Sequence, residues 1–465
     1  MGQLNFENLQ TDLLLEFASS IVVLVIGWLA VLTTRRFFAP KEVRVVQLAF
    51  VAHALGAFAQ VTITREFYGS GDIMVYWIEG IALADVLRYD FVEFAPRLLT
   101  TFLHEQPDLP FTLYGTGATA SQSVVSGVLQ FITGDSLFGS SLLVSMMSLL
   151  GKVGLYLAIK PELAEDKQLS VGAAILLLPS TVYWCGSLSK EAVAIAFFGT
   201  LVWALRKIAA RERLLLMVPL ALVSLVVVAM IKAYILLALS FAGGVWVFWT
   251  AQRKKSAAPL VVKPVYLVLG ALLSLGGLSV VARINPEYGS EQIQERASKQ
   301  HMHGAEAGGD SYYELGGNAD EERPLSQQLL LAPAGLFTAL FRPLVFEARS
   351  AMVLANSVES TTLFILLLVS LFWLGLGRAW SLIVDSPAMM FCLVFTASFG
   401  SAVGVLTTNL GTLSRYRAPM MPFFAALVAV LWLEGKKARS ARIAANASPG
   451  QARRSGMISA PVSGR

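Results

Sequence analysis

Three polar side chains interrupt an apolar stretch early in the chain, YGSGDIMVYWIEG, and their types and spacing could do chemistry. Asp72, Tyr76 and Glu79 stand at positions i, i+4 and i+7, which share one face of a helix. At 1.5 Å per residue, such a face presents two carboxylates roughly 10 Å apart along the axis. One could act as a general base toward a hydroxyl group, and the other could bind a divalent ion or orient a sugar. Because Asp72 follows a glycine-rich turn, it could instead be a helix N-cap.

Five basic residues stand at the boundaries of apolar segments later in the chain. They are Lys190, Lys232, Arg342, Arg415 and Arg417. Ammonium and guanidinium groups bind phosphate through charge-assisted hydrogen bonds, which arginine often makes in a bidentate geometry. If the five converge on one face of a membrane, they would hold a phosphate-bearing lipid. For any one of them, the alternative is a long side chain that extends to the lipid headgroups.

Three further charged residues lie near or within apolar segments. Glu347 and Glu359 flank the region of the arginines, so we expect them to pair with those cations as structural supports. Lys152 lies inside an apolar segment, where charge is costly, and could face a cavity or stretch toward the inner surface. Whether a divalent metal ion takes part is left open by these residues.

The elements that must position these residues are membrane-spanning helices. The chain has 465 residues, of which 55% are hydrophobic and 14% are charged, and its mean hydropathy is +0.64. Helices are the spanning elements expected for such apolar runs, because lipid offers the backbone no hydrogen-bond partners. The sequence therefore predicts an all-α polytopic membrane protein with eleven spans, at about 13–34, 43–63, 136–159, 169–184, 190–205, 214–231, 233–250, 264–281, 361–376, 388–407 and 417–433.

The distribution of basic residues predicts the orientation. Lys and Arg accumulate in loops that stay in the cytoplasm, and alternate loops of this chain hold most of its 36 Lys and Arg. This places the amino terminus outside, the carboxyl terminus inside and two large segments outside, 64–135 and 282–360. Within them, 120–134 and 329–346 are predicted to be re-entrant or interfacial helices. Asp72 and the five basic residues then lie at or close to the outer face.

The domain organisation follows from the same pattern. Residues 1–433 are predicted to form a single transmembrane domain, and 434–465 a basic, disordered cytoplasmic tail near anionic lipid headgroups. The net charge of +5 is explained by this asymmetric distribution, so nucleic acid is not expected as a partner.

Four segments give the chain a resemblance to known proteins: GSGDIMVYW, LPSTVYWCGSLSKEAVAIAFFG, LFRPLVFEARS and SRYRAPMMPFF, in this order. The RYRAPMMP stretch is similar to the Arg-Tyr-Arg-x-Pro-x-x-Pro end of many lipid-phosphosugar-dependent glycosyltransferases of the GT-C superfamily. The second segment, in which an aromatic residue, serine, lysine and an acid begin a helix, is similar to O-antigen polymerase-like proteins. The resemblance covers most of the chain and rests on short motifs.

GT-C enzymes place a catalytic carboxylate in the first large external loop and bind a polyprenyl-phosphate sugar donor within the membrane. The resemblance implies that Asp72 is the catalytic carboxylate and that Glu79 assists it. The commoner family signature has two acids one residue apart, whereas Ile73 and Met74 follow Asp72 here. The residues implied in substrate binding are Tyr76, Lys190, Lys232, Arg342, Arg415 and Arg417.

The function implied is transfer of a sugar from a polyprenyl-phosphate-linked donor to a glycan or lipid acceptor. It would occur at the outer face of the bacterial inner membrane, in cell-envelope polysaccharide assembly. The expected partners are membrane lipids, the lipid-linked sugar and envelope-assembly proteins. A transporter or flippase for a lipid-linked or anionic substrate is one alternative, and the gathering of the candidate residues outside counts against it. A non-catalytic scaffold for envelope assembly is the other.

Overall fold

The computed structural model describes residues 13–69, 71–105, 108–254, 312–313, 315, 330–348 and 351–447. Within these ranges the chain forms helices and no strand, apart from one isolated β-bridge between Tyr312 and Asn409. The α-helices are α1 (Leu13–Thr33), α2 (Pro40–Thr62), α3 (Asp72–Tyr89), α4 (Phe91–Phe102), α5 (Ala118–Thr133), α6 (Leu137–Ile159), α7 (Glu165–Leu177), α8 (Pro179–Trp184), α9 (Lys190–Ala209), α10 (Leu214–Lys254), α14 (Ala332–Phe341), α15 (Ala351–Leu374), α16 (Leu376–Val384), α17 (Pro387–Leu406), α18 (Leu410–Tyr416) and α19 (Met421–Ala447).

Seven of the described helical segments are long and apolar enough to cross a membrane. An eighth results if α18 and α19, which meet at a bend of 78°, together form one span. The chain is therefore an all-α protein of the multi-pass membrane class. The seven segments are Leu13–Phe37, Pro40–Tyr68, Leu137–Glu162, Lys190–Ala209, Leu214–Gln252, Val353–Leu374 and Pro387–Leu406.

The predicted count of eleven spans is not confirmed. The segment 169–184, predicted as one span, is broken into α7 and α8 by an extended residue, Leu178. Pro179 explains the break, because a proline removes a backbone donor and holds the preceding residue in an extended conformation. The predicted span 264–281 lies outside the described residues.

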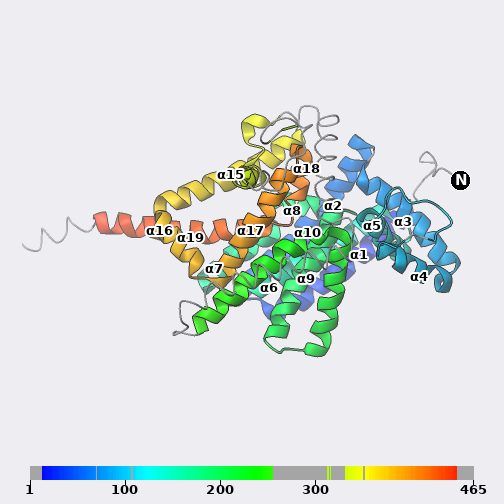
Figure 1. Cartoon of the computed structure of the whole chain (residues 1–465), viewed down its shortest axis with the longest axis horizontal. Helices are drawn as coiled ribbons and strands as arrows, with labels where there is room; N and C mark the ends of the chain where they lie inside the picture. Colours follow the sequence, from blue (N-terminus) through cyan, green and yellow to red (C-terminus); the bar gives the residue numbers. More distant parts are fainter. Residues whose placement is uncertain are drawn as a thin grey trace, which may run out of the picture.

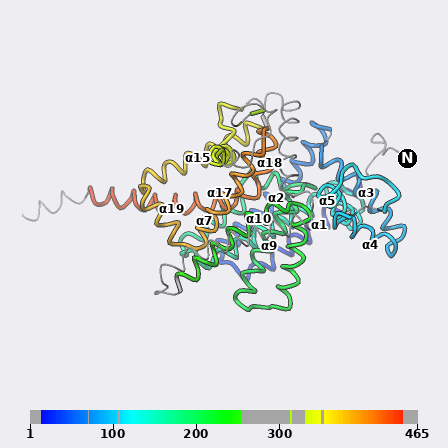
Figure 2. The backbone as a smooth tube through the Cα atoms, viewed as in Figure 1, coloured from blue at the N-terminus to red at the C-terminus, as the bar shows by residue number. Residues whose placement is uncertain are grey.

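The long helix α10 bends at Lys232, where the sequence predicted a turn between two spans. Lys232 has φ −151° and ψ 69°, far from helical values. The parts of α10 before and after this residue are both apolar. Figure 2 shows the two halves of α10 running in different directions. The predicted turn is confirmed, and it brings the Lys232 side chain to the ends of other helices.

The segments predicted to be re-entrant or interfacial are also helical. Residues 120–134 fall in α5, and 329–346 contain α14, an apolar helix of 10 residues. Their placement relative to a membrane stays a prediction. The first part of the predicted tail is not irregular, since α19 continues to Ala447; the remainder lies outside the described residues.

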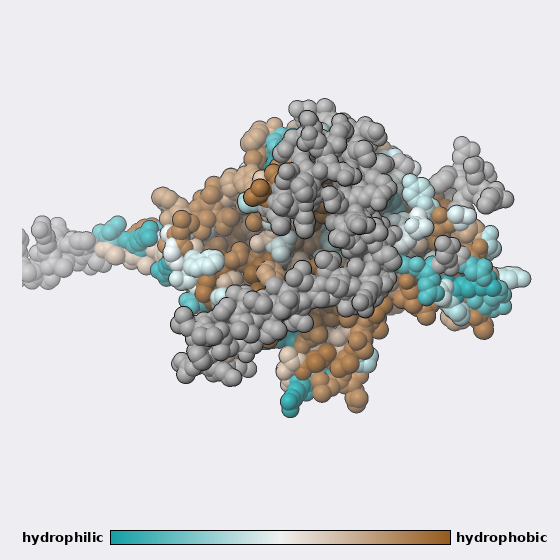
Figure 3. Space-filling view, in the orientation of Figure 1, coloured by the Kyte–Doolittle hydropathy of each residue, from teal (hydrophilic) through white to brown (hydrophobic). Residues whose placement is uncertain are grey.

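Central helices α6, α9, α10 and α17 pack together, with α3, α4 and α5 at one end of the molecule and α15, α16 and α19 at the other (Figure 1). Figure 3 shows apolar surface over α9 and the first half of α10, and hydrophilic residues gathered around α3 and α4 and at the α9–α10 turn. This distribution is typical of helices whose middle is surrounded by lipid and whose ends are exposed to water.

Glycines allow a close helix contact between α6 and α9. A Cβ on Gly199 of α9 would overlap the carbonyl oxygen of Gly151 on α6, and a Cβ on Gly151 would lie 2.5 Å from the Ala196 carbonyl oxygen. Small residues let helix backbones approach in this way in membrane proteins.

Replacing Gly199 with alanine is expected to destabilise the protein by about 1–3 kcal/mol, because the added methyl group must push two backbones apart. The measurement is the midpoint of thermal unfolding in detergent. Gly243→Ala is the matched control, since a Cβ there has no atom within 4 Å. Equal midpoints for the two variants would contradict the close contact.

Two layers of charged residues lie at opposite ends of the helices. Lys190 begins α9, and Arg206 follows sixteen residues later, about 24 Å further along the axis. At the end that carries Arg206, residues in or next to α2, α6, α7, α9 and α19 form three ion pairs: Arg206–Glu162 at 2.9 Å, Lys160–Glu42 at 2.7 Å and Lys167–Glu434 at 3.1 Å. The end near Lys190 carries the residues predicted to do chemistry.

Candidate functional site

An ion pair joins the first broad loop to the distant end of the chain. Arg415 Nη1, on α18, lies 2.9 Å from Asp72 Oδ2, at the first residue of α3. The Asp72 side chain is 53% exposed and the Arg415 side chain 26% exposed. Two glycines with positive φ, Gly69 at 61° and Gly71 at 128°, precede Asp72 and direct the chain into α3. The predicted proximity of Asp72 and Arg415 is therefore confirmed.

A buried carboxylate lies on the other side of Arg415. Glu191 Oε1, in the first turn of α9, accepts a hydrogen bond from Lys232 Nζ at 2.7 Å and lies 3.4 Å from Arg415 Nε. The side chains of Glu191 and Lys232 are only 2% and 5% exposed. The bend in α10 makes this contact, because it places Lys232 at the level of the α9 amino terminus. Glu191 thus ties α9, α10 and α18 together at one point.

Lys190 supplies the third cation of this group. Its Nζ donates a hydrogen bond to Thr119 Oγ1 at 2.9 Å and lies 5.8 Å from the centre of the Tyr76 ring. Among the described residues, no carboxylate forms an ion pair with it. We call Asp72, Lys190, Glu191, Lys232 and Arg415 the charged cluster. Its three cations and two carboxylates leave one positive charge in surplus.

Tyrosine rings line the charged cluster. Lys232 Nζ lies 4.6 Å from the centre of the Tyr416 ring, and Arg415 Cζ lies 5.2 Å from the same ring. Burial, and then the negative charges of Asp72 and Glu191, raise the pKa of Tyr76, so its hydroxyl stays protonated at neutral pH. Tyr76 can therefore donate a hydrogen bond but does not add negative charge.

Glu79 lies on the same helix as Asp72 but has other partners. Its side chain, 3% exposed, accepts hydrogen bonds from Ser123 Oγ at 2.5 Å and from the Tyr114 backbone amide. Ser123 Oγ also lies 3.2 Å from the carbonyl oxygen of Thr119, the residue that contacts Lys190. Glu79 holds the start of α5 in place beside the charged cluster, rather than contacting Asp72.

Arg342 and Arg417, both predicted to bind substrate, contact other groups of the protein instead. Arg417 is fully buried, and it donates hydrogen bonds to the Arg342 carbonyl oxygen at 2.8 Å and to Ser360 Oγ at 2.8 Å. Arg342 pairs with Glu347 at 2.7 Å, as predicted for a structural support. Glu359 forms no ion pair among the described residues; it accepts hydrogen bonds from Ser180 instead.

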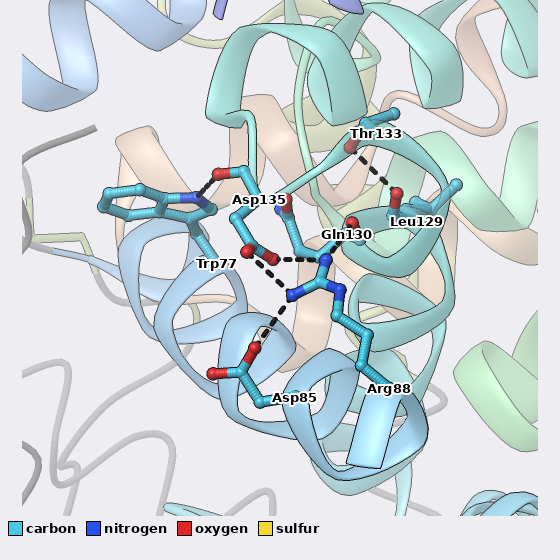
Figure 4. Close-up of polar contacts among 7 residues, drawn as sticks. All are labelled: Trp77, Asp85, Arg88, Leu129, Gln130, Thr133 and Asp135. Atoms are coloured by element: carbon cyan, nitrogen blue, oxygen red, sulfur yellow. Dashed lines mark hydrogen bonds and ion pairs between the residues drawn. The ribbon is translucent and has the colours of Figure 1, made fainter. Parts of the chain in front are cut away.

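The position of α3 is fixed at its other end by Arg88 (Figure 4). Both of its terminal nitrogens donate to the Asp135 carboxylate, at 2.8 and 2.9 Å, and one of them donates to the Gln130 carbonyl oxygen at 3.0 Å. The Trp77 indole donates to the Asp135 carbonyl oxygen at 3.0 Å. Asp135 has φ 66°, in the turn between α5 and α6. Arg88 therefore locks α3, and with it Asp72, onto that turn.

Arg88→Met is expected to lower the free energy of unfolding by about 1–3 kcal/mol and to speed amide hydrogen exchange in the α5–α6 turn. The reason is that the bidentate pair and the carbonyl contact are lost together. Arg97→Met is the control, because its side chain is equally exposed, at 34%, and its partners Glu93 and Asp108 are more exposed than Asp135. Equal exchange in the turn for the two variants would refute the role of Arg88.

A metal centre is not evident in the described part of the chain. No group of three or more His, Cys, Asp or Glu side chains there is arranged to hold a metal ion. Cys185 and Cys392 are buried and free. The chemistry of the charged cluster suits an anion beside an exposed carboxylate, since Lys190 forms no ion pair among the described residues and the Arg415 side chain is 26% exposed.

Sequence reasoning missed Glu191. The signal was present, because an acid directly after the helix start in SLSKEAV lies in the first turn, where helix dipoles favour negative charge.

The fold and the charged cluster define a class, that of multi-pass helical membrane proteins with a buried ionic site at one end of the helices. The chain matches no protein-family model, no curated protein and no solved structure.

Proposed function

We propose that this chain is a membrane glycosyltransferase that moves a sugar from a polyprenyl-phosphate donor to a glycan or lipid acceptor. The observation that carries the proposal is the ion pair of Asp72 with Arg415, beside a lysine that has no carboxylate partner in the part of the chain that the structure describes. An exposed carboxylate can serve as a base, and the surplus positive charge suits a phosphate. These two groups are what transfer from a lipid-linked phosphosugar requires.

In the proposed reaction the donor phosphate binds Lys190 and Arg415, and its charge competes with Asp72 for the guanidinium. The freed Asp72 carboxylate takes the proton from the acceptor hydroxyl as that oxygen bonds to the anomeric carbon. The bond from the anomeric carbon to the phosphate oxygen breaks, and the electron pair leaves with the phosphate. Arg415 and Lys190 stabilise the charge that develops there, while Glu191 keeps Arg415 and Lys232 in position.

The proposed location is the outer face of the bacterial inner membrane. Support comes from the opposite end of the helices, where exposed basic residues such as Arg211 and Arg213 follow α9. Basic residues favour the cytoplasmic side, which leaves the charged cluster outside. The prenyl chain of the donor would lie against the apolar helix surfaces that surround the cluster.

A transporter or flippase for a lipid-linked anion is the second candidate. The break between α7 and α8 favours it, since discontinuous helices are common at transporter binding sites. The two functions differ in their products. A flippase changes the membrane face of its lipid without altering it, whereas a transferase yields a lipid phosphate without its sugar.

The test is deletion of the gene, followed by mass analysis of lipid-linked saccharides. The transferase proposal predicts that an unmodified lipid-linked donor accumulates, that the wild-type gene removes it and that Asp72→Asn does not. Asp108→Asn is the control, because Asp108 is 85% exposed and pairs with Arg97, which is not part of the charged cluster. A normal lipid pool in the deletion strain would contradict the proposal.

A further inference from the structure

A second set of polar side chains runs along the interface between α2 and α6, apart from the charged cluster. Along α6 they recur every three or four residues and so share one face. From Ser141 to Lys160 they cover 19 steps of the helix, or about 28 Å, which is close to the thickness of the hydrocarbon layer. The five within the helix, each at most 1% exposed, are Ser141, Ser145, Ser148, Lys152 and Tyr156.

Helix α2 presents a matching face to these residues. Glu42, His53 and Gln60 are separated by 11 and 7 residues, spacings that return to the same side of a helix. They are 5%, 0% and 1% exposed. The two helices run antiparallel, as the pairing of Glu42 with Lys160 and of His53 with Ser145 requires. We call these residues of α2 and α6, with Lys160, the polar seam.

The middle level of the polar seam is a hydrogen-bonded group. Lys152 Nζ lies 3.1 Å from His53 Nε2 and 2.9 Å from Thr181 Oγ1. A charged ammonium group can only donate, so Nε2 must accept and Nδ1 must carry the hydrogen. Nδ1 then donates to Ser145 Oγ at 3.3 Å, and Ser145 donates to the His53 carbonyl oxygen at 3.1 Å. Both hydrogen-bond partners of the ammonium group are neutral.

Other titratable groups face Lys152 from the neighbouring helices α8 and α15. They are the Cys185 thiol and the Glu359 carboxylate. Glu359 accepts hydrogen bonds from Ser180, next to Thr181, and among the described residues no carboxylate forms an ion pair with the ammonium group. An ammonium group in a bilayer interior is costly, and an apolar side chain would serve packing better.

The two outer levels complete the polar seam. At the end near Arg206, Glu42 accepts hydrogen bonds from the Tyr156 hydroxyl and from Lys160 Nζ. At the other end, Gln60 Oε1 and Ser141 Oγ are buried without a protein partner among the described residues. The antiparallel register places Gln60 and Ser141 within about one helical turn of each other. Buried oxygens without protein partners are commonly satisfied by internal water.

We propose that the polar seam conducts protons between the two faces of the membrane, with Lys152 and His53 as the exchanging pair. A proton moves from Lys152 Nζ to His53 Nε2, which leaves a neutral amine and an imidazolium ion. The imidazolium releases its Nδ1 proton through Ser145 and water at the level of Ser141 and Gln60. A second proton then recharges the amine from the side of Tyr156. Internal water returns the ring hydrogen from Nε2 to Nδ1, which restores the starting tautomer, so one proton has left for each one that entered.

The test is proton flux into liposomes that hold the purified full-length chain and an internal pH-sensitive dye. With an acid outer solution and valinomycin to balance charge, wild-type liposomes should acidify faster than protein-free liposomes, and more slowly in D₂O. His53→Leu and Gln60→Leu should each reduce the protein-dependent rate by roughly tenfold or more, because proton transfer needs partners within hydrogen-bond reach. Ser357→Ala is the control, since this buried serine donates to the Leu354 carbonyl oxygen of its own helix, α15.

Two variants of the polar seam, His53→Leu and Gln60→Leu, keep the test valid if one of them fails to fold. Gln60→Leu removes an oxygen that has no partner among the residues that the structure describes, so it should fold even where His53→Leu does not. Wild-type flux equal to that of protein-free liposomes would overturn the proposal. Flux that persists in a folded Gln60→Leu protein would overturn it as well, because the path would then lie elsewhere.

Discussion

Replacing Asp72 with asparagine is expected to abolish sugar transfer while leaving the binding of a lipid phosphate at or above the wild-type level. Asparagine keeps the size of the side chain but cannot accept a proton from the acceptor, and general-base catalysis supplies about 10²–10⁴ in rate. Binding is spared because the Asp72 carboxylate competes with phosphate for Arg415, which lies 2.9 Å away. Turnover and affinity should therefore move in opposite directions.

The measurement pairs transfer by purified protein in nanodiscs with binding of polyprenyl phosphate to the same sample. Arg415→Gln provides the contrast, since it should weaken binding and transfer together. A loss of binding in Asp72→Asn would show that Asp72 holds the ligand instead of competing with it. Wild-type turnover in Asp72→Asn would remove Asp72 from the chemistry altogether.

Replacing Glu191 with alanine is expected to cost about 3–5 kcal/mol of stability, because it leaves buried cations without their carboxylate. Lys232 lies 2.7 Å from Glu191 with only 5% of its side chain exposed, so water cannot replace the lost partner. Helices α9, α10 and α18 meet at this point. We therefore expect a large fall in the thermal unfolding midpoint and a loosened Arg415.

The control for Glu191 is another glutamate that pairs with a lysine. Glu212 lies 2.6 Å from Lys207, but its side chain is 53% exposed. Glu212→Ala should change stability by about 1 kcal/mol or less, as exposed pairs do. Glu191→Gln, which retains an acceptor for Lys232, should fall between the two. Equal effects of Glu191→Ala and Glu212→Ala would contradict the buried ionic site.

The sequence predicted the class of fold and the meeting of Asp72 with Arg415, for a physical reason. Hydropathy identifies helices that lipid can surround, and the order of basic loops assigns each helix end to one of two layers. Residues in the same layer of a narrow bundle have a good chance of contact, even when 343 positions separate them. The same argument places Lys190 and Lys232 in the layer that contains Asp72 and Arg415.

Sequence spacing could not decide which side chains face the charged cluster. Arg415 lies in the last turn of α18 and Arg417 directly follows that helix, so one contacts Asp72 while the other donates to the Arg342 carbonyl oxygen. Glu79 shares a helix face with Asp72, yet its partners are Ser123 on α5 and the Tyr114 amide that precedes α5. These outcomes depend on how neighbouring helices pack, which hydropathy does not encode.

The number of spans also depended on packing. Apolar composition made 169–184 look like one crossing, but Pro179 divides it into α7 and α8. The partners of Glu16 could not be predicted from the sequence either. Glu16 is buried in α1 and accepts hydrogen bonds from Ser136 and from the first backbone amides of α6. A carboxylate of one helix that caps another requires a tertiary contact to be recognised.

The most direct test of the account is binding of polyprenyl phosphate and of the uncharged polyprenol to the purified protein, measured by native mass spectrometry. We predict that the phosphate form binds, that polyprenol binds far more weakly, and that Lys190→Gln and Arg415→Gln each abolish the difference. Equal binding of the two lipids by the wild-type protein, or an unchanged preference for the phosphate form in both variants, would contradict the assignment of the charged cluster as a phosphate site.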